Sequence, residues 1–212
     1  MTYQTINPDI AAKAAVYLTT NDPKLGEIIA RAGLCTITPH TDYYKALVEE
    51  IIGQQLHVKA AASIRTRFEG LFGGIFPEPA IILEKSIEEL RTAGLSRAKA
   101  AYIRDLAQHV VDSSLVFDHL DSLADTEIIS ELTDVKGVGE WTAHMFLMFC
   151  MGRLDILAHG DLGIRAGIRK LYGLDQLPTT QEVAVIAETH HWHPYATIAC
   201  WYMWYSLDNK PM

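Results

Sequence analysis

A glycine-containing turn and a later aspartate are the residues whose types and spacing best suit chemistry in this chain. Gly137-Val138-Gly139 separates a helix-forming run, residues 125–134, from an apolar run, residues 141–151. Glycine lets the backbone turn tightly and leaves the first amides of the next helix clear of side chains. Such amides attract phosphate. Asp161 is placed to cap a later helix, and a fixed carboxylate in a partly dry site stabilises positive charge. The pattern predicts a phosphate clamp, and it leaves Asp161 either as a simple helix cap or as a carboxylate that could stabilise charge.

Length and composition describe an ordinary globular protein. The chain has 212 residues, 49% of them hydrophobic and 21% charged, which is enough for one large domain or two small lobes. No apolar run reaches membrane-spanning length and the start lacks a signal peptide, so we expect a soluble, intracellular protein that does not bind membranes. The net charge of -8 argues against non-specific coating of DNA, but it leaves room for a local DNA-binding face.

Cysteine and histidine spacing argues against a metal centre. Cys35, Cys150 and Cys200 lie far apart, without a CxxC pair, so we expect buried thiols rather than disulfides, zinc or an iron–sulfur cluster. Four histidines could be interpreted as a metal site, but their spacing matches no closed zinc pattern. They are His159, His190, His191 and His193.

Helical periodicity dominates the sequence and predicts an all-α fold of about ten helices without a sheet. Cap residues predict where several helices begin, and residues 73–79 form a loop rich in glycine and proline. Residues 35–38 are the only weak strand candidate. Helix starts are expected at Asn7-Pro8, Asp22-Pro23, Thr41, Val58, Ser86, Ser96, Asp161, Thr179 and Tyr195.

Two polar features allow both a structural and a functional interpretation. Gln54-Gln55 interrupts two apolar helical runs, either as a solvated corner or as a probe aimed at a ligand. A basic group around residues 91–104 is either a solvated helix face or a patch for an anionic partner. Its members are Arg91, Arg97, Lys99 and Arg104.

Four segments, in order, resemble the helix-hairpin-helix DNA glycosylase superfamily, in its 3-methyladenine DNA glycosylase II (AlkA/Mag-like) branch. They are Ile51–Leu56, Leu132–Ala143, Gly160–Arg165, and Trp192–Thr197 with Trp204. The resemblance covers roughly residues 40–206. It implies a two-lobed helical bundle with the active site in the cleft between the lobes. One lobe would be residues 40–155, ending in the hairpin region at about 125–151, and the other residues 1–39 with 156–212.

The resemblance also implies roles for individual residues. Asp161 matches the catalytic aspartate, and Gly137, Val138 and Gly139 with Thr142 match a phosphate-binding hairpin. It implies no required cofactor. Lys136, Gln54 and Gln55 match residues that contact DNA, and Gln55 would be the wedge that fills the gap left by the flipped base. The base pocket would be lined by Trp141, Tyr195, His159 and Met145. A structural Na+ or K+ would be held by the carbonyls of Thr133, Val135 and Val138.

Trp141 bears on the type of reaction. Members that also cut the DNA strand carry a lysine at this position as a Schiff-base nucleophile, so the resemblance implies a monofunctional enzyme that leaves an abasic site. Alkylated bases of the 3-methyladenine type are the expected substrates. The alternatives are another damaged base, such as uracil or a deaminated purine, and a non-catalytic protein that binds DNA lesions. Ala158 and Ala196 replace a proline and an arginine common in relatives.

The expected partner follows from the same resemblance. It implies that the chain acts on damaged double-stranded DNA, as a monomer. A bacterial cytoplasm, at the nucleoid, is the expected location, or the nucleus in a eukaryote. The small β domain that precedes the helical core in some relatives is not expected, because helices begin near the start of the chain.

Overall fold

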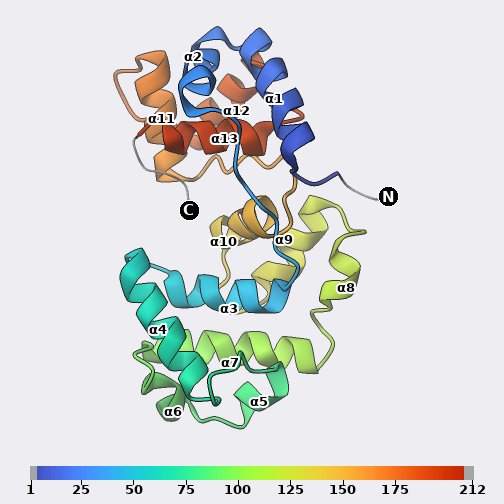
Figure 1. The fold of residues 1–212 in the computed structure, drawn as a ribbon, viewed down its shortest axis with the longest axis vertical. Helices are drawn as coiled ribbons and strands as arrows, with labels where there is room; N and C mark the ends of the chain where they lie inside the picture. Colours follow the sequence, from blue (N-terminus) through green and yellow to red (C-terminus); the bar gives the residue numbers. More distant parts are fainter. Residues whose placement is uncertain (1–3, 208–212) are drawn as a thin grey trace. The chain divides into compact units, whose positions relative to one another are not determined.

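The computed structural model describes residues 4–207 and confirms an all-α fold. Within this range the chain forms thirteen α-helices and one π-helix (Figure 1). The β pairing found there is a single isolated bridge between Thr5 and Arg153. Residues 35–38, the weak strand candidate, form no strand. No described helix is long and apolar enough to cross a membrane.

The chain divides into two compact units, each with its own core. Unit 1 is the continuous segment of residues 41–146, and unit 2 combines the described residues before it with those after it. The sequence analysis expected the second change of lobe near residue 155, whereas the division falls at Phe146. The chain therefore leaves unit 2 once and returns to it once.

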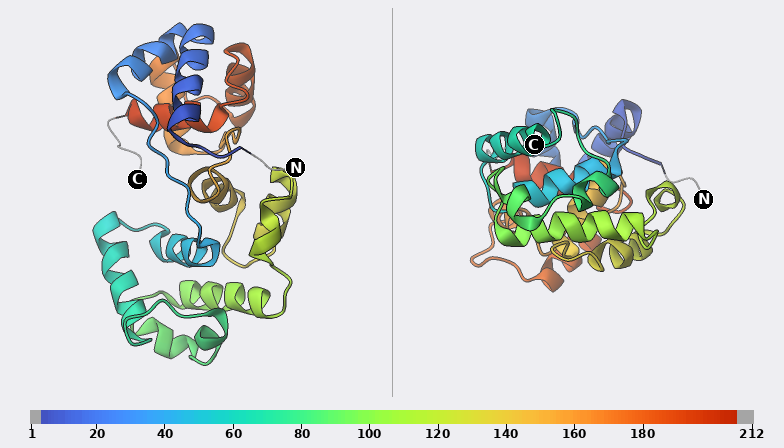
Figure 2. Two further views of the ribbon diagram at one scale, coloured as in Figure 1. Left: turned by 45° about the vertical axis from the view of Figure 1, so that its right-hand side comes forward. Right: turned by 90° about the horizontal axis from the view of Figure 1, so that it is seen from below.

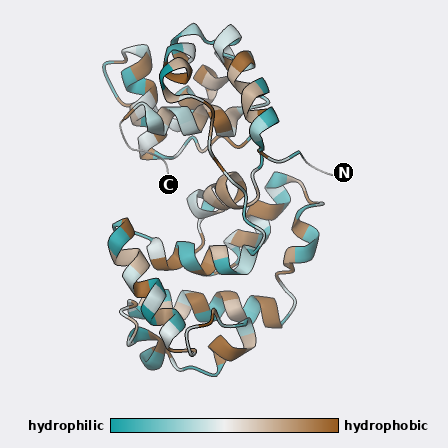
Figure 3. Cartoon of the chain, viewed as in Figure 1, coloured by the Kyte–Doolittle hydropathy of each residue, from teal (hydrophilic) through white to brown (hydrophobic). Residues whose placement is uncertain are grey.

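Unit 1 holds the hairpin and the Gln54-Gln55 turn. α3 lies along α7, and the two helices pack through buried aliphatic side chains (Figures 1 and 2). Figure 3 shows apolar and polar residues alternating along both helices, as expected when one helix face is buried. The helices are α3 (Tyr43–Gly53), α4 (Val58–Gly70), α5 (Pro79–Leu83), α6 (Ile87–Arg91), α7 (Arg97–Val111), α8 (Phe117–Leu120), α9 (Asp125–Thr133) and α10 (Glu140–Met145).

Unit 2 is assembled from two distant segments. The backbone amide of Ile6 donates to the carbonyl of Gly152 at 3.0 Å, and that of His40 donates to Cys150 at 2.8 Å, so both ends of the first segment are held by the second. α13 packs against α2 and α11. The helices are α1 (Pro8–Asn21), α2 (Pro23–Ala32), α11 (Leu162–Tyr172), α12 (Thr180–Thr189) and α13 (Ala196–Tyr205).

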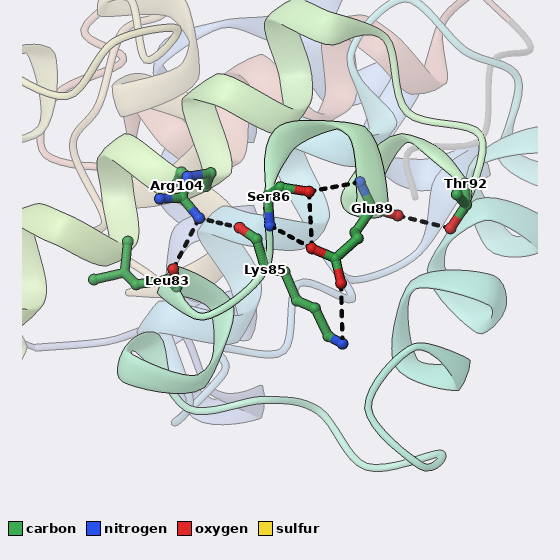
Figure 4. Close-up of polar contacts among 6 residues, drawn as sticks. All are labelled: Leu83, Lys85, Ser86, Glu89, Thr92 and Arg104. Atoms are coloured by element: carbon green, nitrogen blue, oxygen red, sulfur yellow. Dashed lines mark hydrogen bonds and ion pairs between the residues drawn. The ribbon is translucent and has the colours of Figure 1, made fainter.

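The predicted cap residues start their helices as expected. Asn7, Asp22, Ser86 and Asp161 each accept a hydrogen bond from an amide three residues later, which satisfies a donor that the helix itself cannot satisfy. Figure 4 shows one of these caps, in which Ser86 and Glu89 bond each other reciprocally at the start of α6. Helix starts were therefore predictable from local chemistry.

Three short elements were not predicted from the sequence. α5 begins at Pro79, the last residue of the predicted loop, and α8 is a single helical turn. α10 continues into a π-helix, Phe146–Cys150, within a run that the periodicity predicted as one α-helix. Short π-helical segments inside α-helices occur frequently at functional sites.

The three cysteines are buried thiols, and their burial was predicted. Burial raises the pKa of the Cys35 thiol to about 11 and that of Cys200 to about 12. Both thiols therefore stay protonated at neutral pH and behave as small apolar side chains.

Candidate functional site

The predicted hairpin forms in unit 1 between α9 and α10. Leu132, Val135 and Val138 bury their side chains on its inner side, which anchors the turn to the core. Gly139 is the cap residue of α10 and supplies no side-chain hydrogen bond. The first amides of α10 have no acceptor within their own helix, so they can donate to an anion.

Gly137 is required at its position for two independent reasons. Its φ of +85° lies in the left-handed region that favours glycine. A Cβ atom built there would lie 2.2 Å from Cδ2 of the Tyr102 ring, so α7 leaves no room for a side chain. Gly139, by contrast, has a negative φ of -96° and open space around a Cβ. Gly137 shapes the turn, and Gly139 keeps its outer face clear.

Lys136, predicted to contact DNA, is bound to Asp105 of α7. Its backbone amide and its ammonium each donate to one carboxylate oxygen, at 2.9 and 2.8 Å, while 77% of its side chain stays exposed. Partial burial raises the pKa of Asp105, but the bonds and charge of Lys136 outweigh this and hold the pKa below its ordinary value. The pair fixes the hairpin to α7.

The Gln54-Gln55 turn is held against the same hairpin. Gln54 Nε2 donates to the carbonyl of Gly137 at 2.9 Å. Lys99 Nζ donates to the carbonyls of Ile52 and Gln54, at 2.9 and 2.6 Å, and burial lowers the pKa of this ammonium. Gln54 therefore has a structural role that the sequence analysis did not foresee. The structure brings the Gln54-Gln55 turn and the hairpin together.

Gln55 has the geometry of a projecting residue. Its side chain is exposed and its φ is +57°, which is uncommon outside glycine and costs roughly 1–2 kcal/mol. Strained backbone of this kind is found at ligand contacts and active sites. The structure thus separates the two glutamines, with Gln54 fastened to the hairpin and Gln55 facing outward.

The predicted base-contacting residues of unit 1 differ in their exposure. The Trp141 side chain on α10 is 46% exposed, which is unusual for an indole. Met145, one turn later, is 7% exposed, and Thr142 is 4% exposed. Trp141 therefore presents an accessible aromatic face, whereas Met145 and Thr142 are buried.

The three carbonyls predicted to hold a monovalent cation lie in and before the hairpin turn. The carbonyl of Val135 accepts a bond from the amide of Val138 at 3.1 Å, which closes the turn. The hydroxyl of Thr133 donates back to the carbonyl of Ile129 at 2.8 Å. In the part of the chain that the structure describes, no group of three or more His, Cys, Asp or Glu side chains could hold a metal ion.

Asp161 lies at the start of α11 in unit 2, where the sequence placed it. Its Oδ1 accepts from the amide of Ile164 at 2.8 Å, which is the predicted cap bond. The same oxygen accepts from Nε1 of Trp204 at 2.8 Å. Asp161 is half-buried, so the carboxylate is fixed in a partly dry environment while part of it reaches solvent.

Trp204 is the residue of this site that sequence reasoning missed. The other two tryptophans of unit 2, Trp192 and Trp201, are buried. Trp204 is instead half-buried and its indole N–H binds Asp161. A sequence separation of 43 positions hides this contact from any local pattern. The motif that ends in Trp204 was the only available signal.

His159 and Tyr195, the other predicted pocket residues of unit 2, lie at different places. His159 is half-buried in the turn before Asp161, with Nδ1 3.1 Å from the carbonyl of Leu157. Tyr195 is the cap residue of α13 and its ring meets Tyr17 of α1 edge-on at 5.4 Å. Trp204 stands near the other end of α13.

The basic group predicted around residues 91–104 is not a patch of unpaired charge. Arg91 and Arg97 both bind the carboxylate of Glu88, and Lys99 binds the turn carbonyls described above. Arg104 donates to the carbonyls of Leu83 and Lys85 (Figure 4). These cations stabilise the fold of unit 1.

The histidines of unit 2 have structural partners. His193 Nδ1 lies 2.8 Å from Oδ1 of Asp155. His190 stacks on Tyr172 at 4.6 Å. Both imidazoles therefore have partners within the protein.

The fold and these motifs coincide with a known family. Residues 48–190 match the HhH-GPD superfamily of base excision DNA repair proteins, and the chain belongs to this superfamily.

Similar curated proteins and solved structures agree with that assignment. The chain is 30% identical to the alkylbase DNA glycosidase-like protein mag2 of Schizosaccharomyces pombe, over 91% of this chain and 92% of that protein. It is 34% identical to DNA-3-methyladenine glycosylase 1 of the same yeast, over 76% of this chain and 71% of that protein.

Two solved structures are also similar over most of their length. The DNA-3-methyladenine glycosidase of Bacillus halodurans superposes with a TM-score of 0.80 at 36% identity, covering 97% of this chain and 92% of that one. The Schizosaccharomyces pombe 3-methyladenine DNA glycosylase Mag1, in complex with abasic DNA, superposes with a TM-score of 0.80 at 31% identity, covering 91% and 95%.

Proposed function

We propose that this protein is a monofunctional DNA glycosylase that excises alkylated bases of the 3-methyladenine type from duplex DNA. Support comes from family membership, from the names of the relatives, and from the DNA complex of Mag1. The observation that carries the proposal is the fixed, half-buried carboxylate of Asp161 in a chain that also holds a glycine hairpin.

The hairpin would hold the DNA backbone. The amides around Gly137, Val138 and Gly139 would donate to a phosphate, and a cation on the carbonyls of Thr133, Val135 and Val138 would offset charge repulsion. Because Thr142 is buried, its hydroxyl would contribute less than these amides. Gln55 would fill the gap left by the extruded base, and Lys136 would approach the backbone with its exposed end.

The base must leave the stack before its bond to the sugar can be cut. Damaged bases unstack at lower cost, which favours their selection. An alkylated purine is cationic, so an exposed indole such as Trp141 would attract it by cation–π contact. Tyr195 would add a second aromatic surface, with His159 at the rim and Met145 in the packing behind.

Asp161 would then act on the reaction itself. Positive charge develops on the sugar as the N-glycosidic bond breaks, and a nearby carboxylate stabilises that charge. The same group would orient the attacking water. The cationic base is already a good leaving group, so no further acid is needed. Trp141 stands where a Schiff-base lysine would be, so the DNA strand would be left intact at an abasic site.

Base release from methylated DNA is the direct test. We expect free 3-methyladenine from the wild-type protein and at least about a hundredfold slower release from Asp161→Asn with unchanged DNA binding. DNA binding without release of any base would overturn the enzyme proposal in favour of a lesion-binding protein. Release of uracil or hypoxanthine instead would keep the chemistry and change the substrate.

Borohydride trapping tests the monofunctional part separately. A lyase forms an imine with the sugar, which borohydride reduces to a stable protein–DNA adduct. We expect no adduct when the protein acts on its substrate. A trapped adduct would show that another amine takes the place of the lysine missing at position 141.

A further inference from the structure

The hydrogen bond between Trp204 and Asp161 is more than helix capping needs. The cap itself is complete with the bond from Ile164 N to Asp161 Oδ1, which lies within the first turn of α11. The second bond reaches the same oxygen from α13, 43 residues later in the chain. One carboxylate oxygen is thus held from two directions by two elements.

The indole is itself fixed by its surroundings. Its ring lies against Phe149 of the π-helix, with centroids 5.6 Å apart and planes 33° apart. On the side of α11 it fits against Gly163, where a Cβ atom would lie 2.7 Å from indole Cδ1 and 2.9 Å from Nε1. The same Cβ would lie 3.1 Å from Asp161 Oδ1. Gly163 therefore serves to leave space for this contact.

We propose that Trp204 is a positioning residue for the catalytic carboxylate, with Gly163 providing the space it needs. This inference rests on the function proposed above. A neutral N–H donor restricts rotation of the carboxylate without cancelling its charge, whereas an arginine or lysine there would neutralise it. The indole would thus set the orientation of Asp161 in advance without itself compensating the charge of the carboxylate. Preorganised charge of this kind needs no rearrangement during the reaction.

Trp204→Phe separates positioning from packing. Phenylalanine keeps an aromatic ring beside Phe149 and loses only the N–H donor and part of the ring area. Trp201→Phe on the same helix is the matched control, because the Trp201 ring stacks on Tyr205 and meets Tyr202 edge-on. We expect Trp204→Phe to lower the single-turnover rate of base release at least about tenfold, at unchanged affinity for abasic-site DNA. Trp201→Phe should stay within about twofold of wild type in rate.

A double-mutant cycle gives the decisive readout. If Trp204 acts through Asp161, then Trp204→Phe should change the residual rate by less than about twofold in the Asp161→Asn background. An equal loss in both backgrounds, or a Trp204→Phe rate equal to that of the control, would overturn the inference. Gly163→Ala should reproduce the loss, because its Cβ displaces the indole. If Trp204→Phe does not fold, the Gly163→Ala variant serves as the test instead.

The two proposals fail in different ways. A wild-type protein that releases no base refutes the glycosylase function, and the positioning role falls with it. If the wild-type protein is active and Trp204→Phe releases the base at the same rate, only the positioning role is refuted. Thermal melting of each variant separates loss of fold from loss of orientation.

Discussion

Gly137 and Gly139 stand two residues apart in the hairpin, yet their surroundings assign them different roles. Only Gly137 combines a positive φ with a neighbour, Tyr102, that would collide with a side chain. Gly139 lies in ordinary extended backbone beside open space. Stability and ligand binding should therefore respond separately to substitution at the two sites.

Gly137→Ala should destabilise the protein by about 2–4 kcal/mol, since it adds both backbone strain and overpacking. Gly139→Ala should cost less than about 1 kcal/mol in stability and should still weaken DNA binding, because its methyl group covers the outer face of the turn. Urea unfolding and DNA titration of both variants measure the two effects. Equal stability losses at both positions would contradict this division of roles.

The residue roles that could be predicted from the sequence depend on short-range contacts, whereas those that could not depend on contacts between distant segments. Asp161 was identifiable because a cap bond spans three residues and leaves a local pattern. The partner that reaches it from α13 left no such pattern, and neither did the bond from Gln54 to Gly137. Residue roles set by distant packing become visible only in the fold.

At the scale of elements, the turn after α3 is held by one cation. Lys99 on α7 donates to two carbonyls at the end of α3, where a helix leaves acceptors unsatisfied. Lys99→Met keeps most of the stem and removes the ammonium, so we expect a loss of about 1–2 kcal/mol. Gln55 should also lose its fixed direction, which would slow base release. Urea unfolding and single-turnover kinetics measure both.

An exposed lysine supplies the control for this change. Lys59 lies exposed on α4, so Lys59→Met removes the same charge without removing a bond to the turn. We expect its stability to stay within about 0.5 kcal/mol of wild type. If Lys99→Met is equally harmless, then the carbonyls are satisfied by other means and the ammonium does not hold the turn.

The ion pair that joins the hairpin to α7 should make stability depend on pH. The pKa of Asp105 is held below its ordinary value of 3.8, mainly by Lys136 against the opposing effect of partial burial. A lowered carboxyl pKa contributes stability that is present above pH 3.8 and is lost as pH falls through the folded-state pKa. The advantage of wild type over Asp105→Asn should therefore be largest near neutral pH and should shrink below that value.

Urea midpoints of the two proteins between pH 2 and pH 7 test this sign, and Asp118→Asn, a change at an exposed aspartate of α8, is a suitable control. A difference between wild type and Asp105→Asn that grows toward acid pH would contradict the assignment.

Element boundaries show where sequence analysis succeeds and where it stops. Caps fixed the starts of α1, α2, α6, α11 and α12, because the deciding hydrogen bonds are local. The π-helix and the one-turn α8 carry no cap signal of their own and depend on the packing around them. The apparent basic patch was misleading for a similar reason, since Glu88 and backbone carbonyls from other elements occupy its charges.

At the scale of the whole molecule, the order of the segments along the chain decides which unit can fold when it is expressed without the rest of the protein. Unit 1 is one uninterrupted segment with its own core, whereas unit 2 needs both ends of the chain. In unit 2, Trp192 donates to the buried carboxylate of Asp22, and Tyr202 donates to the carbonyl of Gly33. Residues 147–212 alone would therefore lose the partners of their own buried polar groups.

We expect residues 41–146, expressed alone, to fold cooperatively and to retain weak DNA binding through the hairpin. A segment of roughly 100 residues with a continuous core lies within the size range of independent domains. It should release no base, because Asp161 lies outside it. Residues 147–212 alone should remain largely unfolded, since burial of Trp192 without Asp22 leaves an indole N–H unsatisfied. Circular dichroism and urea unfolding of both fragments test this, and a non-cooperative 41–146 fragment would show that its core depends on the rest of the chain.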